Sequence, residues 1–165
     1  MDNLKKKKQA RHSDLAAKII IMIIVAELAG SVGSLVTFPS IGWYNTLNKP
    51  AFSPPNWVFG PVWIMLYALM GIAAGLVWHS KSKLKGSALK VYGLQLGMNI
   101  AWSLIFFGLR LLSIAFGEII ILWISILATS AVFRKISRVS SLMLLPYIAW
   151  VTFALILNYS IMVLN

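Results

Sequence analysis

A row of polar and aromatic side chains within one long apolar stretch is the first feature that could do chemistry. Gln95, Asn99, Trp102 and Phe106 follow one another at spacings of four, three and four residues, which places them on one face of a helix. Unpaired amides are costly in hydrocarbon, so Gln95 and Asn99 need hydrogen-bond partners. The spacing leaves two interpretations open: bonds to a neighbouring helix, or contact with a ligand.

Two acidic residues, Glu27 and Glu118, also lie inside apolar stretches. A carboxyl group at membrane depth indicates a functional site by default, although a protonated or hydrogen-bonded structural group is the alternative. No lysine or arginine lies at comparable depth to pair with either one. Arg110, two helical turns from Glu118, could extend toward it.

The tryptophans form a third group. The chain has seven of them, which is more than packing alone requires. Trp57 and Trp78 lie near the ends of apolar stretches, as belt residues do at membrane surfaces, whereas Trp63, Trp102 and Trp150 lie deeper. Three deep indoles with amides nearby would suit a flat aromatic ligand.

Several kinds of chemistry are excluded. The chain has no cysteine, so thiolate metal sites and disulfides are absent. Its two histidines, His12 and His79, lie outside or at the edge of the apolar stretches, so neither is placed to ligate a haem iron, and we expect no metal site. Nucleotide-binding and hydrolase motifs are missing.

The composition indicates which kind of fold holds these residues in place. Of 165 residues, 59% are hydrophobic and 12% are charged, about half the charged share of a soluble domain. The apolar runs suit helices rather than barrel strands, which alternate apolar and polar residues. We predict an all-α, integral membrane bundle of five transmembrane helices over residues 15–165, after a basic cytoplasmic tail at 1–14. The expected spans are about 15–36, 57–78, 88–109, 112–133 and 142–164.

The basic residues predict the orientation. Thirteen of the 15 lysines and arginines fall on the side of the N-terminus, and only Lys49 and Arg110 fall on the other. The positive-inside rule then places the N-terminus in the cytoplasm and the C-terminus outside. Because the basic residues on the cytoplasmic side account for the formal charge of +11, no nucleic-acid partner is expected.

Small residues mark close helix packing. Gly30, Gly33 and Ser34 share a face of the first span, and Gly71 and Gly75 form a G-x-x-x-G pair in the second. Such pairs let helix backbones approach each other. Packing within one chain is the preferred interpretation, and a homodimer seam is the alternative.

Four blocks in order resemble one known family. They are W-Y-N-T-L-N-K-P-A-F-S-P-P-N-W-V-F-G-P-V-W at 43–63, Q-L-G-M-N-I-A-W at 95–102, I-F-F-G-L-R at 105–110, and P-Y-I-A-W at 146–150 with Phe153, Ala154, Asn158 and Tyr159. This pattern resembles the translocator protein family, also called tryptophan-rich sensory proteins or peripheral benzodiazepine receptors. The resemblance covers nearly the whole chain, about residues 27–159.

The resemblance implies a five-helix bundle, often dimeric, with a pocket under a cap at 37–56. Family members bind porphyrins, such as protoporphyrin IX or haem, and synthetic isoquinoline or benzodiazepine ligands. Carried over by motif, the ligand-binding residues would be Trp43, Tyr44, Pro50, Phe52, Trp63, Tyr67, Asn99, Trp102, Phe106, Glu118, Trp150, Phe153 and Ala154. In bacterial members the positions of Trp63 and Trp150 are implicated in light-dependent porphyrin breakdown, so these two would be catalytic if that reaction occurs.

Two positions depart from the family pattern. A sterol motif in animal members has the order Leu/Val, Tyr, then Lys/Arg, but no basic residue follows Leu157 and Tyr159 here. Sterol recognition by that motif is therefore not expected. Phe52 stands where a tryptophan is common, so stacking is retained but an indole N–H is lost.

The function expected first is a receptor or sensor in a prokaryotic cell membrane that binds a porphyrin as ligand, without a required cofactor. Light-dependent oxidative breakdown of the porphyrin is one alternative. Transport of a porphyrin or lipid is another, although no internal repeat supports it. We expect residues 37–56 to form an ordered cap with Trp43 and Phe52 facing the ligand; a loop that only seals the bundle is the alternative.

Overall fold

The structure is a computed structural model that describes residues 2–165, with side chains described from Gln9 onward, and every regular element in that range is helical. Five helical stretches are long and apolar enough to cross a membrane: Gln9–Thr46, Asn56–His79, Lys85–Gly108, Leu112–Arg134 and Arg138–Leu164. The predicted fold class, an all-α membrane protein with five spans, is confirmed.

The helix bounds differ from the predicted spans mainly at both ends of the chain. The long helices are α1 (Asp2–Thr37), α3 (Phe59–His79), α4 (Lys85–Ser103), α5 (Leu112–Arg134) and α7 (Leu145–Leu164). Helix α1 continues without a break through the predicted basic tail, whose side chains up to Lys8 lie outside the described part. The last helical stretch, Arg138–Leu164, is divided into α6 (Arg138–Leu142) and α7 by a turn at Met143 and Leu144, so α7 begins three residues after the predicted start of the last span.

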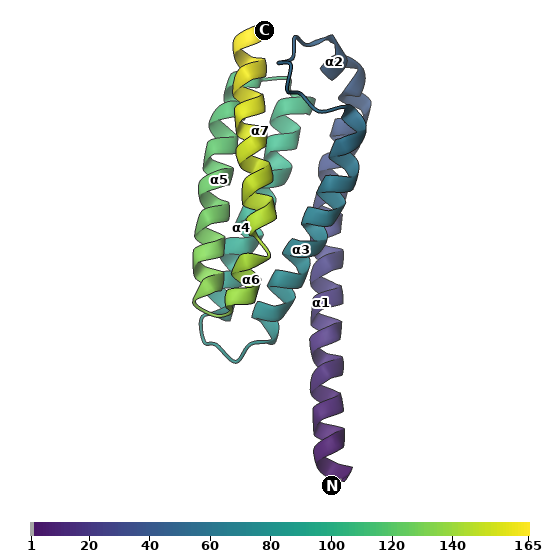
Figure 1. Ribbon diagram of the computed structural model, residues 1–165, viewed down its shortest axis with the longest axis vertical. Helices are drawn as coiled ribbons and strands as arrows, with labels where there is room; N and C mark the ends of the chain where they lie inside the picture. The colour runs from purple at the N-terminus through teal and green to yellow at the C-terminus, as the bar shows by residue number, and fades with distance from the viewer. Residues whose placement is uncertain (1) are drawn as a thin grey trace.

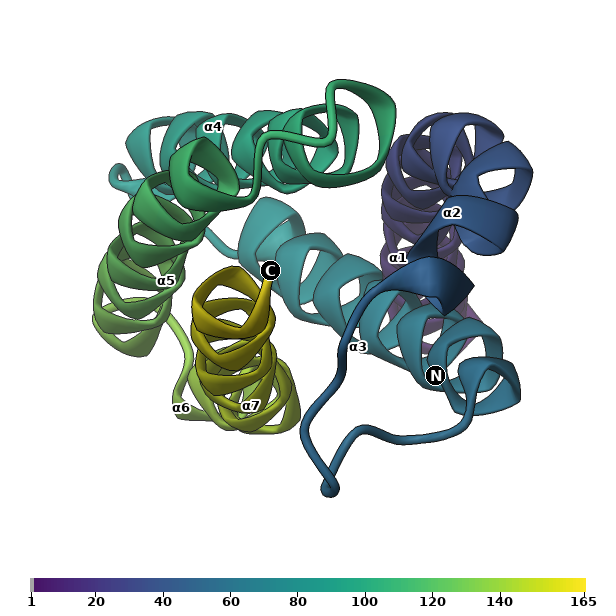
Figure 2. The same ribbon diagram turned by 90° about the horizontal axis from the view of Figure 1, so that it is seen from above.

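The five long helices form one bundle (Figures 1 and 2). Helix α1 packs against α3 and α4, α5 packs against α4 and α7, and α3 also contacts α4 and α7. The N-terminal part of α1 projects beyond the bundle at one end, while α2 (Ile41–Thr46) and the C-terminus lie at the other (Figure 1). We call this second end the cap end.

Glycines bring α1 and α3 into close contact. A Cβ atom at Gly75 would lie 2.6 Å from Cα of Ile19, and one at Gly71 would meet the backbone of Ile23. A Cβ at Gly30 would enter the ring of Tyr67. The G-x-x-x-G pair of α3 is therefore used for packing within the chain, and this face is closed to a second copy.

Residues 37–58 cover the cap end with short helices and a tethered loop. The 3₁₀-helix η1 (Phe38–Ser40) leads into α2, and η2 (Asn56–Val58) leads into α3. The Ser40 hydroxyl donates to the Phe107 carbonyl oxygen (3.0 Å), and the Asn56 amide donates to Oδ1 of Asn45 (2.8 Å). The first bond attaches η1 to Phe107 of the bundle, and the second joins η2 to α2, so the cap is an ordered part of the bundle.

Candidate functional site

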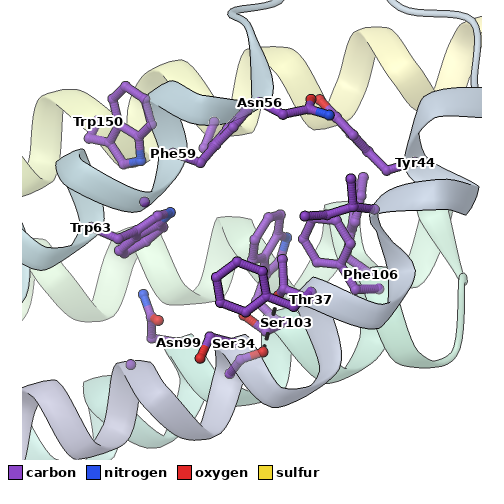
Figure 3. Close-up of a pocket in the computed structure, with 18 of the residues that line it drawn as sticks. Ser34, Thr37, Tyr44, Asn56, Phe59, Trp63, Asn99, Ser103, Phe106 and Trp150 are labelled. Carbon is purple, nitrogen blue, oxygen red and sulfur yellow. Dashed lines mark hydrogen bonds between the residues drawn. The ribbon is translucent and has the colours of Figure 1, made fainter.

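A cavity of about 340 Å³ lies in the half of the bundle nearest the cap, within the size range of small-molecule sites. Figure 3 shows Trp63 and Trp150 toward one end and Tyr44 and Phe106 toward the other. The lining comes from α1 with η1, from α2, from η2 with α3, from α4 with the π-helix η3 (Leu104–Gly108), and from α7. Five separate segments therefore converge on one space.

Aromatic rings form most of its walls. On α3, the rings of Trp63 and Tyr67 lie 5.5 Å apart with an interplanar angle of 30°. On the opposite side, Trp102 and Phe106 stack at 5.2 Å and 29°. Trp150 of α7 is in edge contact with Phe59, at 5.9 Å. The cavity thus presents ring faces from three directions, which suits a flat apolar ligand.

A buried polar network lies beside this aromatic lining. The Tyr67 hydroxyl donates to Oδ1 of Asn99, and the Asn99 amide donates to the Tyr147 hydroxyl (2.8 Å). The Gln95 amide donates to the same hydroxyl (2.7 Å). The two amides predicted from sequence therefore bond to neighbouring helices, and Asn99 also lines the cavity. The interhelical bonds predicted for both amides are therefore found, and contact with a ligand stays a prediction for Asn99, whereas Gln95 lies outside the lining.

A second polar contact fixes the orientation of Trp102. Its indole N–H donates to Oδ1 of Asn158 (3.1 Å), and the Asn158 amide donates to the Leu112 carbonyl oxygen (3.3 Å). Asn158 lines the cavity and is 2% exposed. The sequence analysis did not assign it to the site, although its spacing of eight residues from Trp150 would have placed both on one helical face.

The structure brings together most of the residues that the family resemblance assigned to the pocket. Those in the cavity lining are Tyr44, Trp63, Tyr67, Asn99, Trp102, Phe106, Trp150 and Ala154. Trp43, Pro50, Phe52, Glu118 and Phe153 lie outside it. On the side of α1 that faces the cavity, Ser31, Ser34 and Thr37 were not assigned from sequence, whereas Glu27, singled out as a carboxyl at membrane depth, lies in the lining.

The cap residues explain part of this difference. Trp43 and Tyr44 are adjacent in a short helix and point in different directions: Tyr44 lines the cavity, whereas Trp43 lies between the guanidinium of Arg110 (5.4 Å) and the edge of Phe106 (6.0 Å). Phe52 is half exposed and contacts Phe153 at 6.3 Å. The residue that roofs the cavity is therefore Tyr44, and neither Trp43 nor Phe52 faces into it.

Glu118 lies on α5, away from the cavity. Both of its carboxyl oxygens are buried, and neither has a hydrogen-bond partner among the described residues. The predicted approach of Arg110 is not found, because the Arg110 guanidinium lies over the Trp43 ring instead. Glu118 is thus a buried polar group without compensation, which destabilises a fold.

We expect Glu118→Leu to raise the free energy of unfolding by about 1 kcal/mol or more, because it removes an unpartnered buried polar group. Thermal unfolding in detergent measures this, with ligand affinity expected to stay unchanged. Glu118→Gln is the matched control, since it keeps a polar group at the same place and should give no such gain. A lower midpoint for Glu118→Leu would show that the carboxyl has a stabilising partner.

Comparisons with known proteins agree with this architecture. A family model described as "TspO/MBR family" matches residues 21–164. The chain is 38% identical over 149 residues to the tryptophan-rich protein TspO of Archaeoglobus fulgidus, covering 90% of this chain and 97% of that protein. It is 36% identical to the protein CrtK of Rhodobacter capsulatus, with 88% and 91% covered. It is 38% identical to the human translocator protein over 122 residues, with 72% of each chain covered.

Proposed function

Because the chain belongs to the TspO/MBR family of membrane proteins, we propose that its cavity binds a porphyrin or a related flat, largely apolar molecule. The observation that carries the proposal is the meeting of three indoles, those of Trp63, Trp102 and Trp150, around one space. The indole N–H of Trp150 is buried and has no hydrogen-bond partner among the described residues. It is a donor available to a ligand, as expected in a site where a few polar groups orient an apolar molecule.

The names of the relatives support a binding role in general terms. They include a tryptophan-rich sensory protein of Cereibacter sphaeroides and translocator proteins of mammals. Such names refer to sensing and translocation, both of which require reversible binding. We therefore favour a binding protein over an enzyme.

Quenching of tryptophan fluorescence by protoporphyrin IX in detergent tests the proposal. Saturable quenching is expected, and Trp63→Ala should weaken binding by about 2 kcal/mol, roughly 30-fold in Kd, as for a central aromatic contact. Trp57→Ala is the matched control, because Trp57 is 75% exposed and lies outside the lining. Quenching that does not saturate, or equal affinities for the two variants, would refute the proposed site.

Light-dependent porphyrin breakdown is a second candidate, favoured by the presence of the Trp63 and Trp150 indoles in the same lining. An excited porphyrin would take an electron from a neighbouring indole, and dissolved dioxygen is the oxidant that breakdown of the macrocycle then requires. Following the porphyrin Soret band of the complex in light and darkness tests this candidate. Bleaching no faster than that of free porphyrin in detergent would reject breakdown and leave binding intact.

We also propose that the cap end faces outside the cell. Lys49 and Arg110 are at that end, whereas the turns at the opposite end contain Lys81, Lys83 and Lys135. The larger number of basic residues at the end opposite the cap favours the cytoplasm for it, by the positive-inside rule.

A further inference from the structure

The cavity lining is not equally closed on all sides. Toward α4 and α7 it is sealed: Phe106, Asn99 and Asn158 are at most 3% exposed. By contrast, Ile64 on α3 is 62% exposed, although it too lines the cavity. The other lining residues classed as exposed are Ser31, Phe38 and Gly60. All of these belong to α1 with η1 or to α3, so the cavity reaches the surface between these two helices.

The contact between α1 and α3 explains where the opening lies. Away from the cap the two backbones touch at Gly71 and Gly75, and Tyr67 fills the space beside Gly30. Nearer the cap, α3 presents Gly60, whose Cβ position meets nothing within 4 Å. The helices are therefore tightly packed below Tyr67 and leave room above it.

The part of the cap formed by α2 and the loop that follows it offers no comparable opening. Tyr44 is 5% exposed, and the ammonium group of Lys49 lies over its ring, 4.5 Å from the ring centre. The loop that follows is tied down by Asn48, whose backbone N–H donates to Oδ1 of Asn165 (3.0 Å), while the Asn165 amide donates to the Asn48 carbonyl oxygen (3.0 Å). Passage through the cap would break these contacts, whereas passage between α1 and α3 breaks none of them.

We propose that ligands enter and leave the cavity sideways, from the bilayer, through the opening between α1 and α3. Both edges of the opening lie in stretches that can span the membrane, Gln9–Thr46 and Asn56–His79, so the opening faces lipid. This inference rests on the proposed binding function. By this route, the ligand is a molecule that dissolves in the membrane and reaches the cavity from the leaflet at the cap end.

The α1 edge adds a chemical preference to this route. The hydroxyls of Ser31 and Ser34 donate to the backbone of their own helix (2.8 and 2.7 Å), so toward the opening they offer only acceptor lone pairs. The Glu27 carboxyl lines the same side. A flat molecule that carries N–H or O–H donors is therefore better matched than one that carries only acceptors.

A comparison of one protein before and after chemical modification tests the route, because the chain contains no cysteine that would react in the unmodified background. Ile64→Cys is purified, reconstituted in lipid nanodiscs, and measured before and after modification with N-cyclohexylmaleimide. Stopped-flow quenching by protoporphyrin IX gives both rate constants. We expect association and dissociation each to slow at least tenfold after modification, by similar factors, since a plug obstructs both directions. Ile121→Cys, 54% exposed on α5 and outside the lining, is the matched control and should not change.

A second variant tests the competing route. Asn48→Cys with Asn165→Cys, cross-linked by a short bis-maleimide, locks the cap where these two residues already meet, and neither residue lines the cavity. Unchanged exchange rates are expected. Slow exchange in the locked cap, or unchanged rates in fully modified Ile64→Cys, would overturn the lateral route while binding still stands. An absence of saturable binding by unmodified protein would overturn the porphyrin proposal and the route with it.

Discussion

Replacing Gly71 by valine is expected to lower the free energy of unfolding by about 3 kcal/mol, the upper end of the usual cost of overpacking. The reason is the contact of α3 with α1, where a Cβ at Gly71 would lie 2.6 Å from the backbone nitrogen of Ile23. Backbone atoms cannot rotate away as a flexible side chain can, so the two helices must separate. Separation would also expose the neighbouring contact of Gly75 with Ile19.

Gly97→Val is the control for this prediction. Gly97 lies in the middle of α4, and a Cβ there meets nothing within 4 Å. Both substitutions change helix propensity equally, so the difference between their thermal midpoints in detergent isolates the packing term. Gly71→Val should also lose protoporphyrin binding, because the α1 wall of the cavity moves. Equal midpoints for the two variants would mean that α1 and α3 do not pack as the structure shows.

Hydropathy and charge were sufficient to predict the five spans. Apolar runs of about 20 residues have few structural alternatives in a membrane. The second and fourth predicted spans therefore lie close to α3 and α5, whereas the third begins after the start of α4 and runs on through η3. The turn before α7 was missed because Leu142 to Leu145 are as apolar as the helix that follows. Hydropathy does not report such a local turn.

The helical faces within the spans were also predictable. Spacings of three and four residues placed Asn99, Trp102 and Phe106 together, and all three line the cavity. This worked because the helical period fixes the relative directions of side chains on one helix. The tight packing of Gly71 and Gly75 followed from the same kind of pattern.

The cap and the α1 wall could not be derived in this way. In a short helix such as α2, only one of two adjacent aromatics can point inward, and composition does not say that this is Tyr44 rather than Trp43. On α1, the polar residues that face the cavity include Ser31 and Ser34, whose hydroxyls bond to their own backbone. Serine does this in many helices with no site nearby, so its presence in the sequence carried no functional signal.

The polar network leads to the second large effect, that of Tyr147→Phe. The Tyr147 hydroxyl accepts hydrogen bonds from both Gln95 and Asn99, at 2.7 and 2.8 Å, and all three residues are at most 3% exposed. Removing one oxygen atom leaves two buried amide donors without that acceptor. The cost is about 1–3 kcal/mol for each unsatisfied group, so a clear loss of thermal stability in detergent is expected.

The loss should extend from stability to binding. The side-chain oxygen of Asn99 accepts a hydrogen bond from the Tyr67 hydroxyl, and both residues line the cavity. If the Asn99 amide rotates to bond a different acceptor, it will lose this bond to Tyr67. Tyr159→Phe provides the matched control, because Tyr159 is 51% exposed and lies outside the cavity lining. Since phenylalanine preserves the ring at both positions, packing is retained, including the edge contact of residue 147 with Trp63 at 6.2 Å. If Tyr147→Phe is as stable as Tyr159→Phe, water or another acceptor replaces the hydroxyl. If its protoporphyrin affinity is also unchanged, the network does not hold the aromatic wall in place.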